Sequence, residues 1–346
     1  MPIAISRKEQ QVKPLQKPVS LNIKEYYNKR NKILIIRGVG GLGDIFMHRM
    51  MFEDFKRVMP EAEIHFACPK FYHEAIIDHP FIDKILDLKE FKKEDYIISY
   101  NTTTACGRGE MKLAPLAGPN RSDIWAAHCG LILTKHEMHI SITDEEKRQA
   151  EIILQNNRNS DGPIVILCPI SAMHNKNLSD QQLTELVYKL KEKGLCVIGL
   201  HNAPIKLFVK NQIPIISDVN LRIWMAILNV ADYVISVDTA AFHCRGGMKK
   251  PVVGIFTFAN AHAYGQHYPK AELLQGPCDW GHKGCYEWSK CPAIKEKPLI
   301  PCLTNITSEM IMNSVDNMMA KWPLNNSNNV RNNGTTCETN NSQGCA

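Results

Sequence analysis

Three groups of residues in this 346-residue chain have types and spacing that could do chemistry, and each follows a predicted buried strand. The first is the glycine turn GVGGLGD over 38–44. Its glycines, Gly40, Gly41 and Gly43, would let another molecule approach the backbone closely. Asp44 would open the following helix, where the helix dipole stabilises a carboxylate. It could cap that helix or, facing a cleft, act as a general base that removes a hydroxyl proton.

The second group is the segment VDTAAFH over 237–243. Asp238 and Thr239 would lie where a strand ends and a helix starts, a position at which backbone amides bind phosphate. His243 falls one helical turn after Thr239, so both side chains can face one ligand. The same residues are equally typical of a helix cap followed by a core histidine.

The third group is the polar loop PISAMHNK over 169–176. Lys176 could offset the charge of a diphosphate leaving group. A loop lysine is more often simply solvated, so this residue gains weight only together with the other two groups.

The glycine turn also has the form G-x-G-x-x-G between a strand and a helix, which is the dinucleotide-binding fingerprint. That fingerprint requires an acidic residue at the end of the second strand, to hold the ribose hydroxyls. Here the second strand, 63–67, ends in Ala67-Cys68-Pro69-Lys70 without an acid. A nucleotide-dependent oxidoreductase therefore remains an alternative, supported by the glycine turn but not by the acidic residue.

Short β-branched runs alternate with longer amphipathic segments between Asn31 and Pro323. We predict strands over 33–37, 63–67, 84–88, 95–99, 138–142, 164–168, 195–200, 232–237 and 251–256. We predict helices over 44–58, around Ile124–His128, and over 144–156, 180–193, 221–229, 239–247 and 308–320. The turn-rich segment Asn157–Pro163 separates two such arrays. The pattern predicts two doubly wound α/β domains, and ligands of such sheets bind at the carboxyl ends of the strands.

These boundaries divide the chain into a basic tail over 1–31, domains over 32–157 and 158–322, and an Asn-rich tail over 323–346, both tails expected to be disordered. Residues 1–31 hold seven basic and two acidic residues, a net +5 of the chain's +6. The folded body, at about +1, is not a platform for nucleic acid. No apolar run could span a bilayer and no secretory signal is recognisable, so a cytoplasmic protein is expected. The basic tail could contact anionic lipid or an acidic acceptor.

Four of the twelve cysteines cluster near the end of the second domain, as Cys278, Cys285, Cys291 and Cys302. Four thiolates within 25 residues could hold a structural zinc or iron ion. The spacing, C-x6-C-x5-C-x10-C, contains no C-x2-C pair. Free or disulfide-paired thiols are therefore an open alternative.

Together, GGLGD, the Lys176 loop and VISVDTAAFHCRGGMKKPVVGIF resemble glycosyltransferase family 9, the ADP-heptose:lipopolysaccharide heptosyltransferases. The resemblance runs from Lys32 to Trp322. It implies the GT-B architecture, in which two Rossmann-like domains face each other across a cleft. The N-terminal domain would hold the acceptor, and the C-terminal domain would hold the nucleotide-sugar.

The resemblance also implies roles for the three groups. Asp44 would be the base that activates the acceptor hydroxyl, and Lys176 would contact the donor diphosphate. Asp238, Thr239 and His243 would lie at the nucleotide-sugar, with the amides of Thr239, Ala240 and Ala241 reaching phosphate. A sugar, such as a heptose, would be transferred to a glycan or glycolipid with inversion and without an obligatory metal. If the acceptor is held in the membrane, the enzyme would lie at the inner face of the membrane.

Two positions depart from the family pattern, and both lie on the donor side. Ala240 replaces a glycine and adds a methyl group where the backbone should approach phosphate. Thr257-Phe258-Ala259 stands where the family usually has Gly-Pro-Thr. These departures keep open a non-catalytic relative that only binds nucleotide-sugar.

Overall fold

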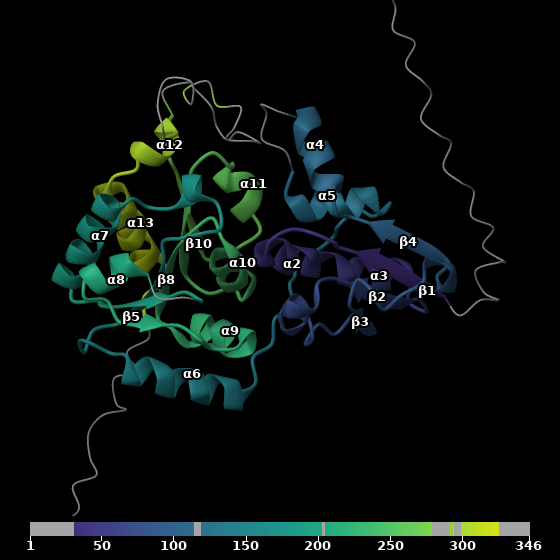
Figure 1. The fold of residues 1–346 in the computed structure, drawn as a ribbon, viewed down its shortest axis with the longest axis horizontal. Helices are drawn as coiled ribbons and strands as arrows, with labels where there is room; N and C mark the ends of the chain where they lie inside the picture. Colours follow the sequence, from purple (N-terminus) through teal and green to yellow (C-terminus); the bar gives the residue numbers. More distant parts are fainter. Residues whose placement is uncertain are drawn as a thin grey trace, which may run out of the picture.

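The computed structural model describes residues 31–113, 119–202, 205–278, 291, 293 and 299–324. Within them the strands form two parallel sheets, each in its own lobe, and the two lobes lie side by side (Figure 1). The tails predicted over 1–31 and 323–346 fall outside the described residues except for Asn31, Pro323 and Leu324. No described helix combines the length and the apolar character needed to cross a bilayer.

The sheet of the first lobe has the strand order β3-β2-β1-β4. Its strands are β1 (Lys32–Ile36), β2 (Glu63–Ala67), β3 (Lys84–Leu86) and β4 (Ile98–Asn101). The helices of this lobe are α2 (Leu42–His48), η1 (Arg49–Met51), α3 (Phe52–Val58), η2 (Lys70–Ala75), η3 (Lys93–Asp95), α4 (Ala105–Leu113) and α5 (Arg121–His128). The order reverses between β1 and β4, so the turn after β1 opens at the switch point where ligands of such sheets bind.

The second sheet has the order β7-β6-β5-β8-β9-β10. Its strands are β5 (Ile164–Cys168), β6 (Cys196–Leu200), β7 (Ile215–Ile216), β8 (Tyr233–Val237), β9 (Val252–Phe256) and β10 (Ala271–Gln275). Its helices are α6 (Asp144–Asn156), η4 (His174–Lys176), α7 (Asp180–Glu192), α8 (Lys206–Lys210), α9 (Leu221–Val230), α10 (Ala240–Gly247), α11 (Ala261–Gly265), α12 (Pro301–Thr304) and α13 (Ser308–Lys321). The switch point lies between β5 and β8, and the loops that follow these two strands carry Lys176 and Asp238.

Most predicted elements are present within a few residues of their expected bounds, and two differ. The predicted helix over 44–58 begins at Leu42 and is interrupted by the 3-10 turn η1. The predicted strand over 138–142 is wrong, because no strand forms there. Its alternating residues Met138 and Ile142 are buried, but the carbonyls of Met138 and His139 accept hydrogen bonds from Arg49 instead of from a neighbouring strand.

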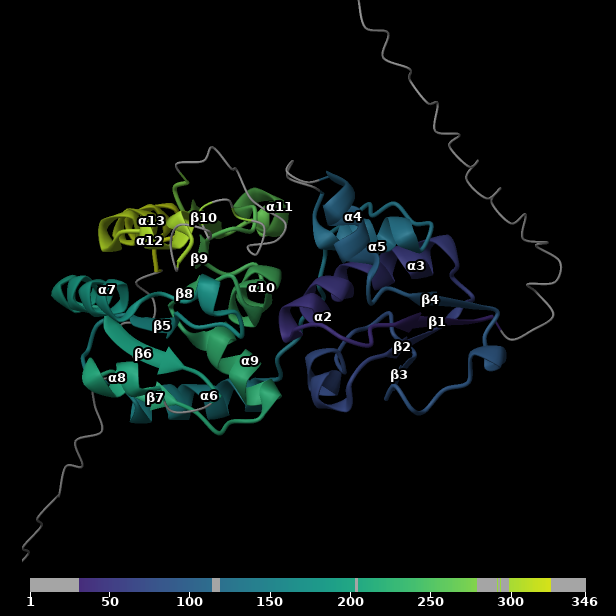
Figure 2. The same cartoon turned by 45° about the horizontal axis from the view of Figure 1, so that its top comes forward.

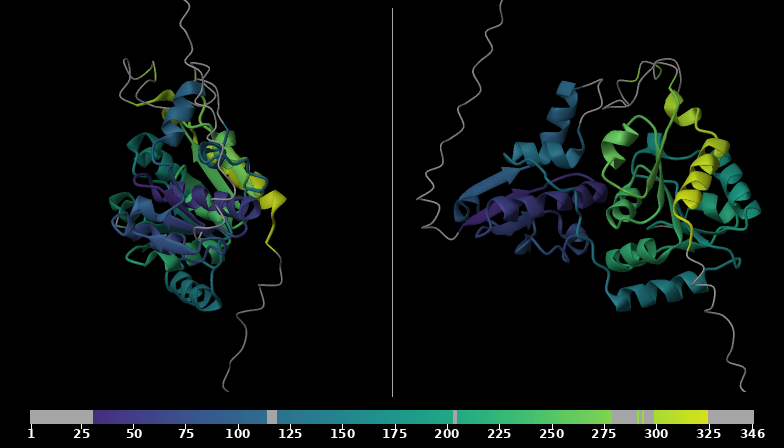
Figure 3. Two further views of the ribbon diagram at one scale, coloured as in Figure 1. Left: turned by 90° about the vertical axis from the view of Figure 1, so that its right-hand side faces the viewer. Right: turned by 180° about the vertical axis from the view of Figure 1, so that it is seen from behind.

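The helix α6, counted above with the first domain, packs against α9 of the second sheet (Figure 3). Arg222 on α9 donates to both carboxylate oxygens of Glu146 on α6, at 2.7 and 2.8 Å. The chain therefore crosses between the sheets in the extended segment between His128 and Asp144, ahead of the turn-rich segment Asn157–Pro163.

A fully buried arginine fastens this crossing segment to the first lobe. The Arg49 side chain donates to both oxygens of Asp78, at 2.9 and 3.0 Å, and to the carbonyls of Ala75, Met138 and His139. Arg222 of the second lobe reaches the same Asp78 at 3.3 Å. Because a buried charge is tolerated only with partners, these groups fix the crossing segment and both lobes relative to one another.

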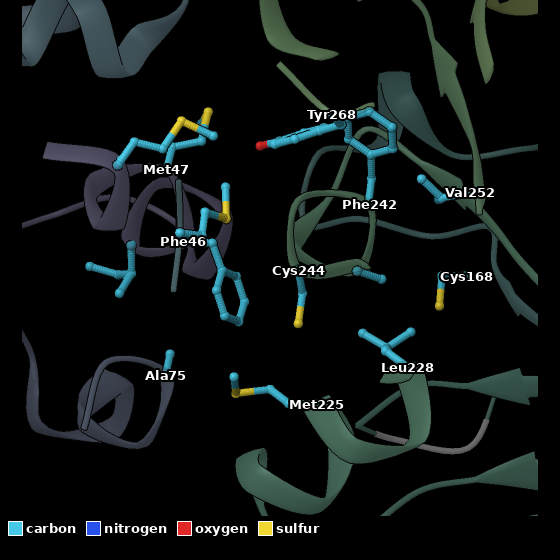
Figure 4. Close-up of a cluster of buried hydrophobic side chains, with 14 of the residues drawn as sticks. Phe46, Met47, Ala75, Cys168, Met225, Leu228, Phe242, Cys244, Val252 and Tyr268 are labelled. Carbon is cyan, nitrogen blue, oxygen red and sulfur yellow. The ribbon is translucent and has the colours of Figure 1, made fainter. Parts of the chain in front are cut away.

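Apolar side chains of both lobes form one continuous core between the sheets. Figure 4 shows Phe46 and Met47 of α2 facing Met225 of α9 and Phe242 of α10. The helices α2 and α10 lie next to each other at the centre of this contact (Figure 2). The two lobes are thus packed together and not merely tethered by a linker.

Gly43 on α2 allows this close approach. A Cβ atom at Gly43 would lie 2.9 Å from Cδ2 of His243 and 3.7 Å from the backbone nitrogen of Ala240, both on α10. Contacts below 3.0 Å are not tolerated, so a larger residue would push the two helices apart.

Gly43→Ala is expected to lower the free energy of unfolding by about 1–3 kcal/mol through overpacking. This loss would occur although alanine favours a helix interior over glycine by about 1 kcal/mol. Urea denaturation measures the change. In a protein that also carries His243→Ala, which removes the clashing ring, Gly43→Ala should not lower the free energy of unfolding. If Gly43→Ala lowers the free energy of unfolding equally with and without His243→Ala, the contact between Gly43 and His243 does not limit the packing.

Candidate active site

A cavity of about 750 Å³ lies between the lobes, at the carboxyl ends of both sheets. Its size is within the range of small-molecule sites. The predicted site residues that line it are Gly41, Gly43, Asp44, Lys176, Asp238, Thr239, Ala240, Ala241 and His243. The structure thus brings together side chains from both lobes that the sequence placed after separate strands.

Gly40 does not line the cavity but packs against Arg37 and Asp44. It has a φ of +127°, which a residue with a side chain adopts only with strain. A Cβ atom there would collide with the guanidinium of Arg37 and with the carboxylate of Asp44. The turn therefore needs glycine at this position so that the Arg37–Asp44 pair can form beneath it.

Asp44 is held by two arginines and does not cap its helix. Its Oδ2 accepts a hydrogen bond from Nη2 of Arg37 at 2.5 Å, and its Oδ1 accepts one from Nη1 of Arg121 at 3.0 Å. Arg37 is anchored in turn by the carbonyls of Thr102 and Thr103. Each carboxylate oxygen has two lone pairs, so both retain capacity to accept a further hydrogen bond.

The environment keeps Asp44 ionised. Burial by itself would raise the pKa of Asp44, but the positive charges of Arg121 and Arg37 outweigh it and bring the pKa below its ordinary value. His48 holds the backbone of the same turn, with Nδ1 2.7 Å from the carbonyl of Asp44. Burial lowers the pKa of His48 to about 3, so this imidazole is neutral at physiological pH.

On the opposite wall, Asp238 links Lys176 to His243. The ammonium of Lys176 donates to Oδ2 of Asp238 at 2.6 Å, and Nε2 of His243 lies 3.5 Å from Oδ1. Burial would raise the pKa of Asp238, but Lys176 and then His243 lower it below its ordinary value. His243 is fixed from behind, with Nδ1 2.9 Å from the hydroxyl of Tyr268. Asp238 thus holds Lys176 at the cavity wall.

The start of α10 also faces the cavity. Thr239 is the residue before the helix, and its side chain makes no capping hydrogen bond. Thr239, Ala240 and Ala241, whose amides open the helix, all line the cavity. An uncapped helix start carries partial positive charge and binds anions.

Several cavity residues were not found from the sequence. Arg121 donates to Asp44 and to both oxygens of Glu110, and its guanidinium lies 5.0 Å from the ring centroid of Tyr264 of the second lobe. Phe71, Tyr72 and Trp224 add aromatic surface to the wall. Arg121 opens α5 after the capping residue Asn120, and that cap is the signal that could have drawn attention to it.

The predicted cysteine cluster is not assembled within the described residues, because Cys285 lies outside them. Cys291 and Cys302 are buried, and Cys278 is half-buried. A structural metal at these four cysteines therefore stays a prediction.

The sequence-family model for glycosyltransferase family 9 (heptosyltransferase) matches residues 125–277 of this chain. A comparison with curated protein sequences finds no match. Among solved structures, the family 9 glycosyl transferase of Veillonella parvula DSM 2008 has 14% identity and a TM-score of 0.66, over 85% of this chain and 98% of that one. The ADP-heptose lipopolysaccharide heptosyltransferase II of Escherichia coli has 14% identity and a TM-score of 0.62, over 84% and 99%.

A third similar structure is the dodecameric iron-containing heptosyltransferase TibC of enterotoxigenic E. coli H10407, in complex with ADP-D-beta-D-heptose. It has 14% identity and a TM-score of 0.62, over 85% of this chain and 77% of that one. These likenesses establish the shared two-domain fold, and the family model covers the part of the sequence that forms much of the second sheet. The resemblance found in the sequence is thus confirmed for residues 125–277, which match the family 9 model, and the chain has the GT-B fold of these structures.

Proposed function

We propose that this chain transfers a sugar from a nucleoside diphosphate donor to a hydroxyl of a glycan or glycolipid, with inversion at the anomeric carbon. One observation carries the proposal. The cavity has an ionised carboxylate, Asp44, on one lobe and a lysine with an uncapped helix start, Lys176 and Thr239–Ala241, on the other. A base and an anion site on opposite walls are what a single displacement requires.

Asp44 would accept the proton of the attacking hydroxyl. A carboxylate with a lowered pKa is a weak base, so it takes the proton late, once the new bond to the anomeric carbon has made the hydroxyl acidic. Arg37 and Arg121 fix the direction of the carboxylate, which reduces the reorganisation needed in the transition state. The acceptor would thus lie on the side of the first lobe, near Phe71 and Tyr72.

The bond between the anomeric carbon and the donor phosphate breaks as the acceptor oxygen attacks from the opposite face. The leaving nucleoside diphosphate takes the electron pair of that bond. Lys176 and the amides that open α10 would stabilise the charge that develops on it. Attack and departure on opposite faces give inversion, and no residue needs to form a covalent intermediate.

ADP-heptose is the first donor to test. The similar TibC structure is a complex with ADP-D-beta-D-heptose, and the similar E. coli protein is an ADP-heptose lipopolysaccharide heptosyltransferase. Ala240 still leaves the start of α10 open to the cavity, because this residue is among those that line it. We therefore propose that the added methyl group is compatible with donor binding.

The proposal is tested by incubating the protein with ADP-, GDP-, UDP- and dTDP-sugars and following nucleoside diphosphate release by mass spectrometry. Release from an ADP-sugar, increased by a glycan or glycolipid acceptor, supports transfer. Donor binding without release under any condition would favour the non-catalytic relative. Binding of NADH alone would favour an oxidoreductase.

Asp44→Asn is expected to lower turnover at least ~100-fold, the scale of general-base loss, with the donor KM little changed. Initial rates with a saturating acceptor measure this. The matched control is Asp54→Asn, which also removes a buried aspartate from an arginine, Arg57, but lies on α3 outside the cavity. Asp54→Asn should retain turnover per folded molecule.

The pH profile tests the same residue independently. Because the pKa of Asp44 lies below its ordinary value, the base stays ionised as the pH falls through the ordinary carboxyl range. The acidic limb of kcat/KM should therefore appear only below about pH 4. Near-normal turnover of Asp44→Asn would refute the assigned role.

Lys176→Gln is expected to weaken binding of ADP about tenfold or more, which corresponds to ~1.4 kcal/mol. The substitution removes a positive charge at the cavity wall and leaves the charge of Asp238 without its ammonium partner. Titration calorimetry with ADP measures the change. Lys189→Gln, which breaks a pair with Glu309 on the surface, is the control and should bind ADP as wild type does. Equal affinity of both variants would exclude Lys176 from the donor site.

A further inference from the structure

A second polar cluster lies away from the cavity, where three segments of the chain meet. Asp123 belongs to α5 of the first lobe, and His136 belongs to the crossing segment between the lobes. His267 follows α11 of the second lobe. The helices α5 and α11 face each other across the contact between the lobes (Figure 2).

The three side chains converge on one point. Nε2 of His136 lies 2.8 Å from Oδ1 of Asp123, and Nε2 of His267 lies 3.6 Å from Oδ2. All three ligand atoms lie within 4.8 Å of one another. The two imidazole rings are parallel, with centroids 3.4 Å apart.

We propose that Asp123, His136 and His267 form a binding site for a divalent transition-metal ion such as Zn²⁺. Two imidazole nitrogens and one carboxylate oxygen are a ligand set that zinc uses in proteins, with water completing the coordination. Ligands about 2.0–2.2 Å from one ion lie roughly 3–3.6 Å apart, so movements of about 1 Å complete the site. Because the lone pair of each nitrogen lies in its ring plane, the two stacked rings must rotate apart to direct both lone pairs at the ion.

The hydrogen bonding within the cluster is incomplete, which favours a ligand. Nε2 of His267 is buried and has no hydrogen-bond partner. Buried polar atoms are usually paired, so an unpaired ring nitrogen beside a carboxylate needs an explanation. A cation between the nitrogen and the carboxylate would satisfy both.

The side chains are also accessible and suitably charged. The side chains are partly exposed, at 19% for His136, 23% for His267 and 30% for Asp123, although Nε2 of His267 itself is buried. Burial would raise the pKa of Asp123, but its interactions with His136 and His267 bring the pKa below its ordinary value. The carboxylate is therefore ionised and ready to act as a ligand.

A metal ion at this point would join both lobes and the segment that connects them. Asp123 lies two residues after Arg121, which holds Asp44. The ion would thus fix the position of α5 relative to the second lobe and, through Arg121, the carboxylate at the cavity. This inference does not depend on the proposed function, because the ion is neither substrate nor part of the displacement.

The test is a titration of the full-length, chelator-treated, tag-free protein with Co²⁺, followed by displacement with Zn²⁺. We expect one Co²⁺ per chain, weak visible absorption bands, and no intense near-ultraviolet bands from thiolate ligands. The thiolate bands distinguish this site from the predicted cysteine cluster. Zn²⁺ should also raise the melting temperature of the wild-type protein.

His267→Gln and His136→Gln are each expected to weaken Co²⁺ binding at least ~100-fold and to abolish the shift in melting temperature. Two variants are used so that a folding defect in one, checked by circular dichroism, leaves the other informative. His128→Gln, an exposed histidine on α5, is the control and should bind as wild type does. Absence of Co²⁺ uptake, or equal uptake by wild type and both variants, would overturn the proposal.

Discussion

The contact between α2 and α10 at Gly43 and His243 is the constraint on which the site depends. At this separation the switch points of the two sheets open into one cavity. Asp44 follows Gly43 directly, and the start of α10 lies one turn before His243, so the contact sets the distance between Asp44 and the start of α10. The packing of the lobes therefore brings the two walls of the cavity together.

Two of the acidic side chains that line the cavity, Asp44 and Asp238, are each paired with basic groups, but with different consequences. Asp44 is bound by arginines that belong to its own lobe, so its charge is oriented yet open to a hydroxyl. Asp238 is paired with Lys176, and both side chains line the cavity on the wall of the second lobe. One wall thus presents a carboxylate held by two arginines, and the other presents an ammonium held by a carboxylate.

The sequence was sufficient for residues whose place follows from a strand end. Asp44, Lys176 and Asp238 follow buried runs, and parallel strands bring such positions to one edge. It was insufficient for Arg121, because its contacts with Asp44 and Tyr264 join distant segments. The strand predicted over 138–142 was wrong because of a distant contact too. Its alternating apolar side chains are buried between the lobes, but its carbonyls accept hydrogen bonds from Arg49 and not from a neighbouring strand. The packing of α6 on α9 likewise depends on a tertiary contact, between Arg222 and Glu146. The turn-rich segment Asn157–Pro163, which was used to place the domain boundary, contains no sign of that contact.

The shared apolar core described above restricts how the molecule can move. Separating the lobes widely would expose Phe46, Met225 and Phe242 to water, and each Å² of apolar surface costs about 25 cal/mol. A large hinge opening is accordingly disfavoured for this chain. Access to the cavity between the packed lobes therefore depends on the loops that line it, such as the one that carries the exposed Met173.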